Sequence, residues 1–217
     1  QRQMCIRDRY GVLAIVIIGI LGIPASSFIA VLSAAGLTIG LAFQGSLSNF
    51  AGGVLILLFK PFKIGDFVKE DVHGNEGLVE GIDLFYTRMR TFDNKIVIIP
   101  NGSLANTSIT NYTANNKRRI EIKVGISYDS DMKRAKDILM NVINSQDGIL
   151  KNEDNKVYVD ALEESQITIG TMAWVMTDDY WKIKWELTEK FKNALDDAGI
   201  EIPFNQLSVT INEKQRK

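Results

Sequence analysis

Charged side chains are missing from residues 10–59, although Asp, Glu, Lys and Arg make up 24% of the 217-residue chain. The overall hydrophobic content of 46% is ordinary for a soluble protein, so this average conceals an apolar N-terminal part and a charged remainder. Long uncharged apolar runs are typical of membrane-spanning helices. The sequence therefore predicts a membrane segment, followed from Lys60 onward by soluble domains.

Cysteine and histidine are nearly absent too, with only Cys5 and His73. A single cysteine excludes an internal disulfide and a multi-thiolate metal site, and His73 in DVHGNEG is typical of a solvated loop residue. The chain has no Walker loop, no G-x-S-x-G and no H-E-x-x-H, and no strongly basic segment. These absences predict no enzyme activity, no metal or other cofactor, and no nucleic-acid partner.

The longest apolar stretch, FIAVLSAAGLTIGLAFQGSLSNFAGGVLILLF, covers residues 28–59. One straight helix of this length would run to roughly 48 Å, beyond the ~30 Å hydrocarbon core of a bilayer. Polar residues around Gly45 interrupt the hydrophobicity, so we predict a kink there, with the second half along the membrane surface. Upstream, residues 10–23 predict the end of another transmembrane helix. Residues 1–9 predict a non-native tail, and a cytoplasmic flank is the alternative.

Small residues form two nearly opposite faces on the first half of this stretch. The two sets are Ser26, Ala30, Ala34, Thr38, Ala42 and Ser46 on one face, and Ser33, Gly36 and Gly40 on the other. A helix of this kind can be clasped by two copies of itself, and repetition of that contact closes a ring. Leu37 and Leu41 lie on one remaining side and Leu32, Ile39 and Phe43 on the other. Periodicity leaves open which of these two sides faces the centre of the ring. The alternative to a pore is that Leu37 and Leu41 are ordinary lipid-facing leucines.

The charged remainder predicts two domains. Short strand-like runs separated by turns predict a small β-barrel over residues 60–116. Residues 117–217 follow the order β-α-β-β-α with a last strand at 207–211, which predicts an α+β ferredoxin-like domain. We expect Asp129 and Ser130 to cap its first helix, and Asp178 and Asp179 its second. Lys60 and Lys63 directly follow the apolar stretch, and positive charges at a membrane exit favour a cytoplasmic location for the domains after it. The glycosylation pattern at Asn101 is then irrelevant.

Three segments resemble a known family. AVLSAAGLTIGLAFQGSLSNFAGGVLILLFKPFKIGD closely resembles the pore helix and linker of the small-conductance mechanosensitive channel (MscS) family, and IPNGSLANTSITNYT and GISYDSDMKRAKDIL are similar to later segments. The resemblance implies a homoheptamer in the bacterial inner membrane, with an Sm-like barrel and a ferredoxin-like domain in the cytoplasm. It implies a channel in contact with membrane lipid that opens under tension and releases ions and small solutes in hypo-osmotic shock. Because the family has three membrane helices, it also implies an N-terminally truncated fragment.

The resemblance assigns roles within the apolar stretch. Leu37 and Leu41 match the two leucine rings of the pore constriction, where a dry apolar neck blocks ions. Pore-helix packing would use small residues that slide past the next copy, namely Ala30, Ser33, Ala34, Gly36, Thr38, Gly40 and Ala42. The hinge matches Gln44 and Gly45, and coupling to the preceding membrane helix or to the barrel matches Phe43, Leu47 and Asn49. The alternative function is a membrane-anchored oligomeric scaffold or sensor without channel activity.

Overall fold

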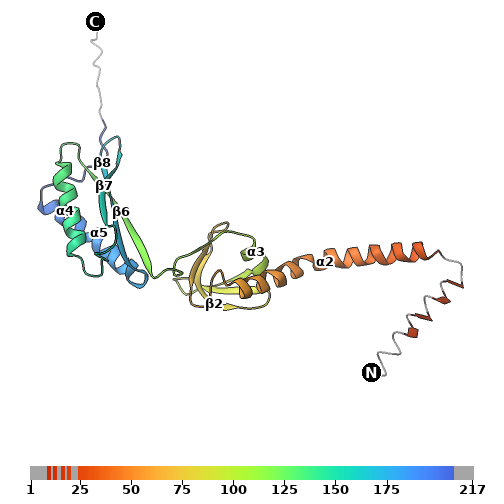
Figure 1. Ribbon diagram of the computed structural model, residues 1–217. Helices are drawn as coiled ribbons and strands as arrows, with labels where there is room; N and C mark the ends of the chain where they lie inside the picture. The colour runs from red at the N-terminus through yellow and green to blue at the C-terminus, as the bar shows by residue number, and fades with distance from the viewer. Residues whose placement is uncertain (1–8, 11, 14–15, 18, 21–23, 208–217) are drawn as a thin grey trace, which may run out of the picture. The chain divides into compact units, whose positions relative to one another are not determined.

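The computed structural model describes residues 9–10, 12–13, 16–17, 19–20 and 24–207. Its contacts divide the chain into two compact units, Gln1–Asn111 and Tyr112–Lys217, and Figure 1 labels the elements of each. The predicted N-terminal tail and the predicted last strand fall almost entirely outside the described residues. Each unit is therefore considered by itself.

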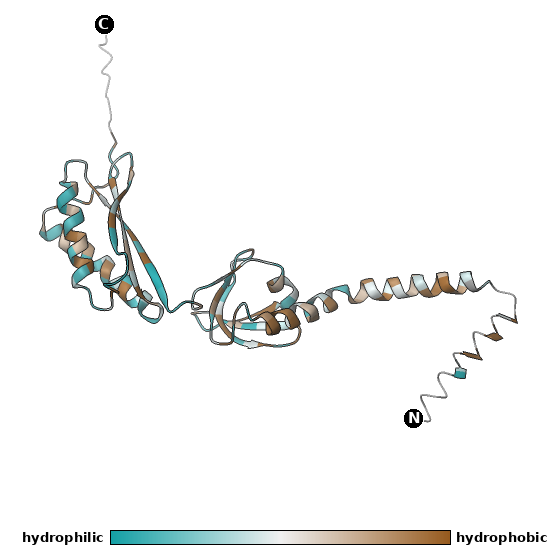
Figure 2. Ribbon diagram, in the orientation of Figure 1, coloured by the Kyte–Doolittle hydropathy of each residue, from teal (hydrophilic) through white to brown (hydrophobic). Residues whose placement is uncertain are grey.

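The apolar stretch forms one long helix, α2 (Ala25–Phe59), and Figure 2 colours most of it from white to brown, as expected for its apolar sequence. The helix ends where Lys60 adopts the left-handed conformation, with φ of 49°, and its N–H donates to the carbonyl of Ile56. Pro61 follows and cannot continue the helical hydrogen bonding. Because α2 is helical on both sides of Gly45, the kink expected there stays a prediction.

Five short strands after α2 form an antiparallel sheet of order β4-β3-β2-β1-β5. Their bounds, with that of the short helix α3, are β1 (Phe67–Glu70), β2 (Glu76–Ile82), β3 (Tyr86–Arg90), β4 (Ile96–Pro100), α3 (Asn101–Ala105) and β5 (Ile109–Asn111). Alternating burial along β2 directs Val79 inward, where it packs with Val68 and Met89. This confirms the prediction of a β-rich domain after the apolar helix.

The second unit places two helices against a three-stranded antiparallel sheet of order β6-β8-β7. The elements are β6 (Lys117–Ile126), α4 (Met132–Ser145), β7 (Lys156–Leu162), β8 (Ile167–Met176), the 3-10 turn η1 (Thr177–Asp179) and α5 (Tyr180–Asp197). Figure 1 shows α4 and α5 on the same face of the sheet. Apolar side chains from the sheet and both helices, such as Ile169, Leu139 and Leu187, fill the core between them.

The helix caps predicted in this unit are wrong in detail. The side chain of Asp131, rather than Asp129 or Ser130, accepts hydrogen bonds from the N–H groups of Lys133 and Arg134 at 2.9 and 3.0 Å. The reason is that residues 127–130 form a turn of their own before α4 begins. Asp178 and Asp179 lie in η1 and make no side-chain cap on α5. The predicted stop of α5 is confirmed, because the helix ends just before Gly199, which has a φ of +69°.

Candidate functional site

The first half of α2 is apolar and exposed around its whole circumference. Every residue from 29 to 48 is exposed in the single chain, and Leu37 and Leu41 are 66% and 61% accessible. Among the described residues, one helix, Ser26–Phe59, is long and apolar enough to cross a membrane. An apolar surface of this extent requires lipid or other helices around it.

The small residues of α2 leave open space beside the helix. A Cβ atom added at Gly36, Gly40 or Gly45 would meet no atom within 4 Å outside the helix itself. The Thr38 hydroxyl donates to the carbonyl of Ala34 at 2.8 Å, so its polar group is satisfied within the helix. Both small faces are therefore free to receive another helix at close range.

The second half of α2 packs on the β-rich domain through a short junction with α3. The Asn49 side-chain oxygen accepts a hydrogen bond from the Gly102 N–H at 3.0 Å, and the rings of Phe50 and Phe85 lie 6.2 Å apart. About two turns further on, Ile56 is only 2% exposed and belongs to the core of the β-rich domain. Burial of such a side chain contributes about 2 kcal/mol. The domain thus holds one face of this half of the helix.

Two adjacent glycines allow that contact. A Cβ at Gly52 would lie 2.5 Å from the backbone oxygen of Asn101, and one at Gly53 would lie 2.3 Å from the backbone oxygen of Leu84. These distances are shorter than any side chain tolerates, and backbone atoms cannot move aside as the end of a flexible side chain can. The helix therefore approaches the domain backbone to backbone.

Asn101 is the polar centre of the junction and is fully buried. Its side-chain oxygen accepts from the Thr87 hydroxyl at 2.7 Å, and its side-chain nitrogen donates to the carbonyl of Asp83 at 2.8 Å. Its backbone N–H donates to the carbonyl of Phe85 at 2.9 Å. One side chain therefore fixes the turn before β3, β3 itself and the start of α3, the elements on which α2 rests.

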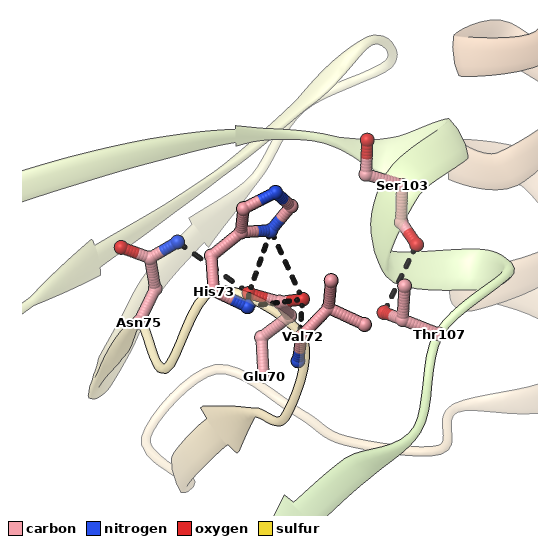
Figure 3. Close-up of polar contacts among 6 residues, drawn as sticks. All are labelled: Glu70, Val72, His73, Asn75, Ser103 and Thr107. Carbon is pink, nitrogen blue, oxygen red and sulfur yellow. Dashed lines mark hydrogen bonds and ion pairs between the residues drawn. The ribbon is translucent and has the colours of Figure 1, made fainter.

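A second buried polar group lies at the end of β1, where the Glu70 carboxylate is enclosed by the following turn (Figure 3). It accepts hydrogen bonds from the N–H groups of Val72 and His73 at 3.0 Å, and the His73 ring nitrogen Nδ1 lies 3.3 Å away. Burial raises the pKa of Glu70, but the hydrogen bonds from His73 and Val72 outweigh it and hold the pKa below the ordinary value of 4.5. The carboxylate therefore stabilises the turn in its charged form.

The sequence matches two family models of mechanosensitive channels. Residues 45–114 match the model described as mechanosensitive ion channel, beta-domain, and residues 120–202 match that described as mechanosensitive ion channel MscS, C-terminal. A small-conductance mechanosensitive channel of Edwardsiella ictaluri is 43% identical over 204 residues, covering 93% of this chain and 71% of that protein. An uncharacterized MscS family protein of Buchnera aphidicola is 42% identical, with 91% and 69% covered. The chain belongs to the MscS family.

Solved structures agree with this membership. The crystal structure of Helicobacter pylori MscS in its closed state is similar, with a TM-score of 0.82 and 34% identity over 89% of this chain and 76% of that one. The cryo-EM structure of Arabidopsis thaliana MSL1 has a TM-score of 0.72 at 18% identity, covering 94% of this chain and 77% of that one, which shows a shared fold. The predicted family is therefore confirmed, and it is a family of channels rather than enzymes.

The predicted site residues of this MscS-family chain fall into two groups. Asn49 contacts the β-rich domain, whereas the others lie on the exposed part of α2, where no described residue brings them together. Their roles in constriction, packing, hinge and coupling stay predictions. Sequence reasoning missed Gly52, Gly53, Asn101 and Glu70. A glycine pair inside an apolar helix is a signal of close backbone approach, and it was available for the first two.

Proposed function

We propose that this chain is the subunit of a homoheptameric, tension-gated channel of the bacterial inner membrane that releases ions and small solutes in hypo-osmotic shock. The observation that carries the proposal is the exposed apolar first half of α2, continuous with a second half held by the β-rich domain. Seven such helices side by side would enclose a pore, with the domains on the cytoplasmic side.

The pore constriction is assigned to Leu37 and Leu41. They lie four residues apart, hence on one side of the helix, and both side chains are exposed. A narrow ring of leucine side chains dewets and blocks ions without a plug. Sliding of Ala30, Ala34, Thr38 and Ala42 past Ser33, Gly36 and Gly40 of the next copy would widen the ring, with a hinge at Gln44 and Gly45.

The soluble part is assigned to two cytoplasmic domains that begin near residues 60 and 117. The five-stranded antiparallel sheet with its short helix supports an Sm-like barrel for the first. For the second, the order β6-β8-β7 places β8 between the two strands joined by α4, which supports a ferredoxin-like plan. Their proposed role is to anchor the second half of α2 and to assemble the ring.

Substitution Leu41→Ser tests the pore assignment. We expect the full-length protein with this substitution, expressed in cells that lack their own mechanosensitive channels, to leak at low tension and to slow growth, because a hydroxyl wets the neck. Patch recordings of channel current against applied suction measure the threshold. Leu32→Ser, a leucine on the other side of α2 that is also exposed, is the matched control and should leave the threshold closer to that of the parent.

An unchanged threshold and normal growth with Leu41→Ser would contradict the constriction. Absence of any tension-dependent current, with a ring still visible by imaging of purified protein, would contradict the channel and favour an oligomeric scaffold.

A further inference from the structure

The second unit contains a cavity of about 350 Å³ between the turn that follows α4 and the first half of α5. This volume lies in the range typical of small-molecule sites. The charged and amide side chains that line it come from this turn, from the end of η1 and from α5: Gln146, Asp147, Asp179, Lys182, Glu186 and Lys190. No part of the channel mechanism uses them.

The floor of the cavity is a buried amide. Gln146 is only 4% exposed, its side-chain nitrogen donates to Glu186 Oε2 at 2.7 Å, and its side-chain oxygen accepts from Lys190 Nζ at 2.7 Å. The nitrogen also reaches the backbone oxygen of Asp147 at 3.2 Å. A single neutral side chain thus holds one carboxylate and one ammonium in fixed positions on successive turns of α5.

The rim of the cavity adds charges of both signs. Asp147, Asp179 and Lys182 are exposed and, within the described part of the chain, form no ion pair with another side chain. Asp179 is the last residue of η1 and Lys182 lies in the first turn of α5, so both side chains are at the start of that helix. Opposite charges in one polar cavity suit a ligand that itself carries both.

We propose that this cavity binds a free α-amino acid, a small zwitterion whose carboxylate faces Lys182 and whose ammonium faces Asp147 and Asp179. Exposed charge pairs contribute little each, and a ligand of this size makes few contacts, so the expected dissociation constant is about 1 mM. The inference does not depend on the channel function, because it concerns side chains outside the proposed pore.

Titration of the purified full chain with L-alanine, followed by saturation-transfer NMR or calorimetry, tests the proposal. L-Alaninamide lacks the carboxylate and N-acetyl-L-alanine lacks the ammonium, so each should bind about tenfold more weakly than L-alanine if both charges are recognised. Equal binding of L-alaninamide would replace the proposal with a simple cation site, and equal binding of N-acetyl-L-alanine with a simple anion site. No saturable binding of L-alanine up to about 100 mM, well above the expected range, would overturn it.

Two exposed side chains locate the site without disturbing the fold. Lys182→Ala and Asp147→Asn should each weaken L-alanine binding about fivefold, which corresponds to one lost charge contact. The matched controls are Lys133→Ala and Asp137→Asn, exposed residues of α4 outside the cavity, and they should bind as the parent does. Equal weakening by the controls, or none by Lys182→Ala and Asp147→Asn, would place the binding elsewhere and contradict the proposal.

Discussion

The two halves of α2 have similar apolar sequences and opposite surroundings. Residues 29–48 are exposed on all sides, whereas from Asn49 onward one face of the helix is held by the β-rich domain, through Gly52, Gly53 and Ile56. The family model of the β-domain also begins at Gly45, within the helix. The second half of α2 is therefore part of the domain fold, whereas the first half is exposed within the described part of the chain.

This difference separates two kinds of glycine. In the first half, Gly36 and Gly40 face open space, and their small size matters only if another helix arrives. In the second half, Gly52 and Gly53 already touch backbone atoms of the same chain. Substitutions in the two halves should consequently affect different properties, namely assembly and gating in the first and folding of the subunit in the second.

Gly53→Ala should give the largest effect. Its Cβ would lie 2.3 Å from the Leu84 carbonyl oxygen, so α2 must shift away from the β-rich domain. We expect a loss of about 3 kcal/mol in the free energy of unfolding. Thermal unfolding of detergent-solubilised protein measures it.

Gly40→Ala is the control for that substitution. The new methyl meets no atom of the subunit outside its own helix, and alanine favours a helix by roughly 1 kcal/mol over glycine, so the unfolding of the subunit should not suffer. If the two variants unfold alike, the proposed difference between the halves is wrong.

Asn101→Ala should have the next largest effect. It removes the partners of the buried Thr87 hydroxyl and of the Asp83 carbonyl, which costs about 2 kcal/mol in the free energy of unfolding. Hydrogen exchange should rise in residues 49–59 and stay unchanged in residues 29–48. The double variant Asn101→Ala/Thr87→Val should cost less than the sum of the single ones, and strict additivity would contradict a direct contact.

Acid should destabilise the β-rich domain through Glu70. Because its pKa is lowered in the folded state, the stabilising contribution is complete at neutral pH and is lost as the pH falls below about 4.5 toward the lowered pKa. Glu70→Gln should cost about 1.5 kcal/mol at pH 7 and flatten this pH dependence, measured by urea unfolding. Glu76→Gln, an exposed carboxylate on β2, is the control and should retain the parent's slope.

The parts of this structure that follow from periodicity could be predicted from the sequence. The long uncharged run predicted α2, and short apolar runs between turn residues predicted strands in both domains, although the one predicted at 207–211 stays untested. The exposed residues Leu37 and Leu41 could be placed on one side of a helix for the same reason, because the spacing of four residues needs no tertiary information.

What could not be predicted depends on contacts between distant segments. Asn101 matched a glycosylation pattern, and nothing local reveals that its side chain is buried against Thr87 and Asp83. His73 was interpreted as a solvated loop residue, and its side chain is indeed 70% exposed, yet its backbone N–H also serves the Glu70 carboxylate. Burial of a polar group is a property of the packed domain rather than of the sequence around it.

Thr38→Ala should give the smallest effect, and it concerns only the first half of α2. The hydroxyl is bonded to the Ala34 carbonyl, so its removal leaves no unpaired donor elsewhere in the subunit. What changes is the bulk on a face that is proposed to slide past the next copy, on the order of a few tenths of a kcal/mol per subunit. We expect a slightly lower tension threshold in patch recordings, and a further decrease with Ser33→Gly.

Thr188→Ala is the matched control, because the Thr188 hydroxyl makes the same bond to the Lys184 carbonyl four residues back in α5. Thresholds that are identical in Thr38→Ala, Ser33→Gly and the parent would contradict the sliding surface, since removal of bulk from a true sliding contact must change the work of opening.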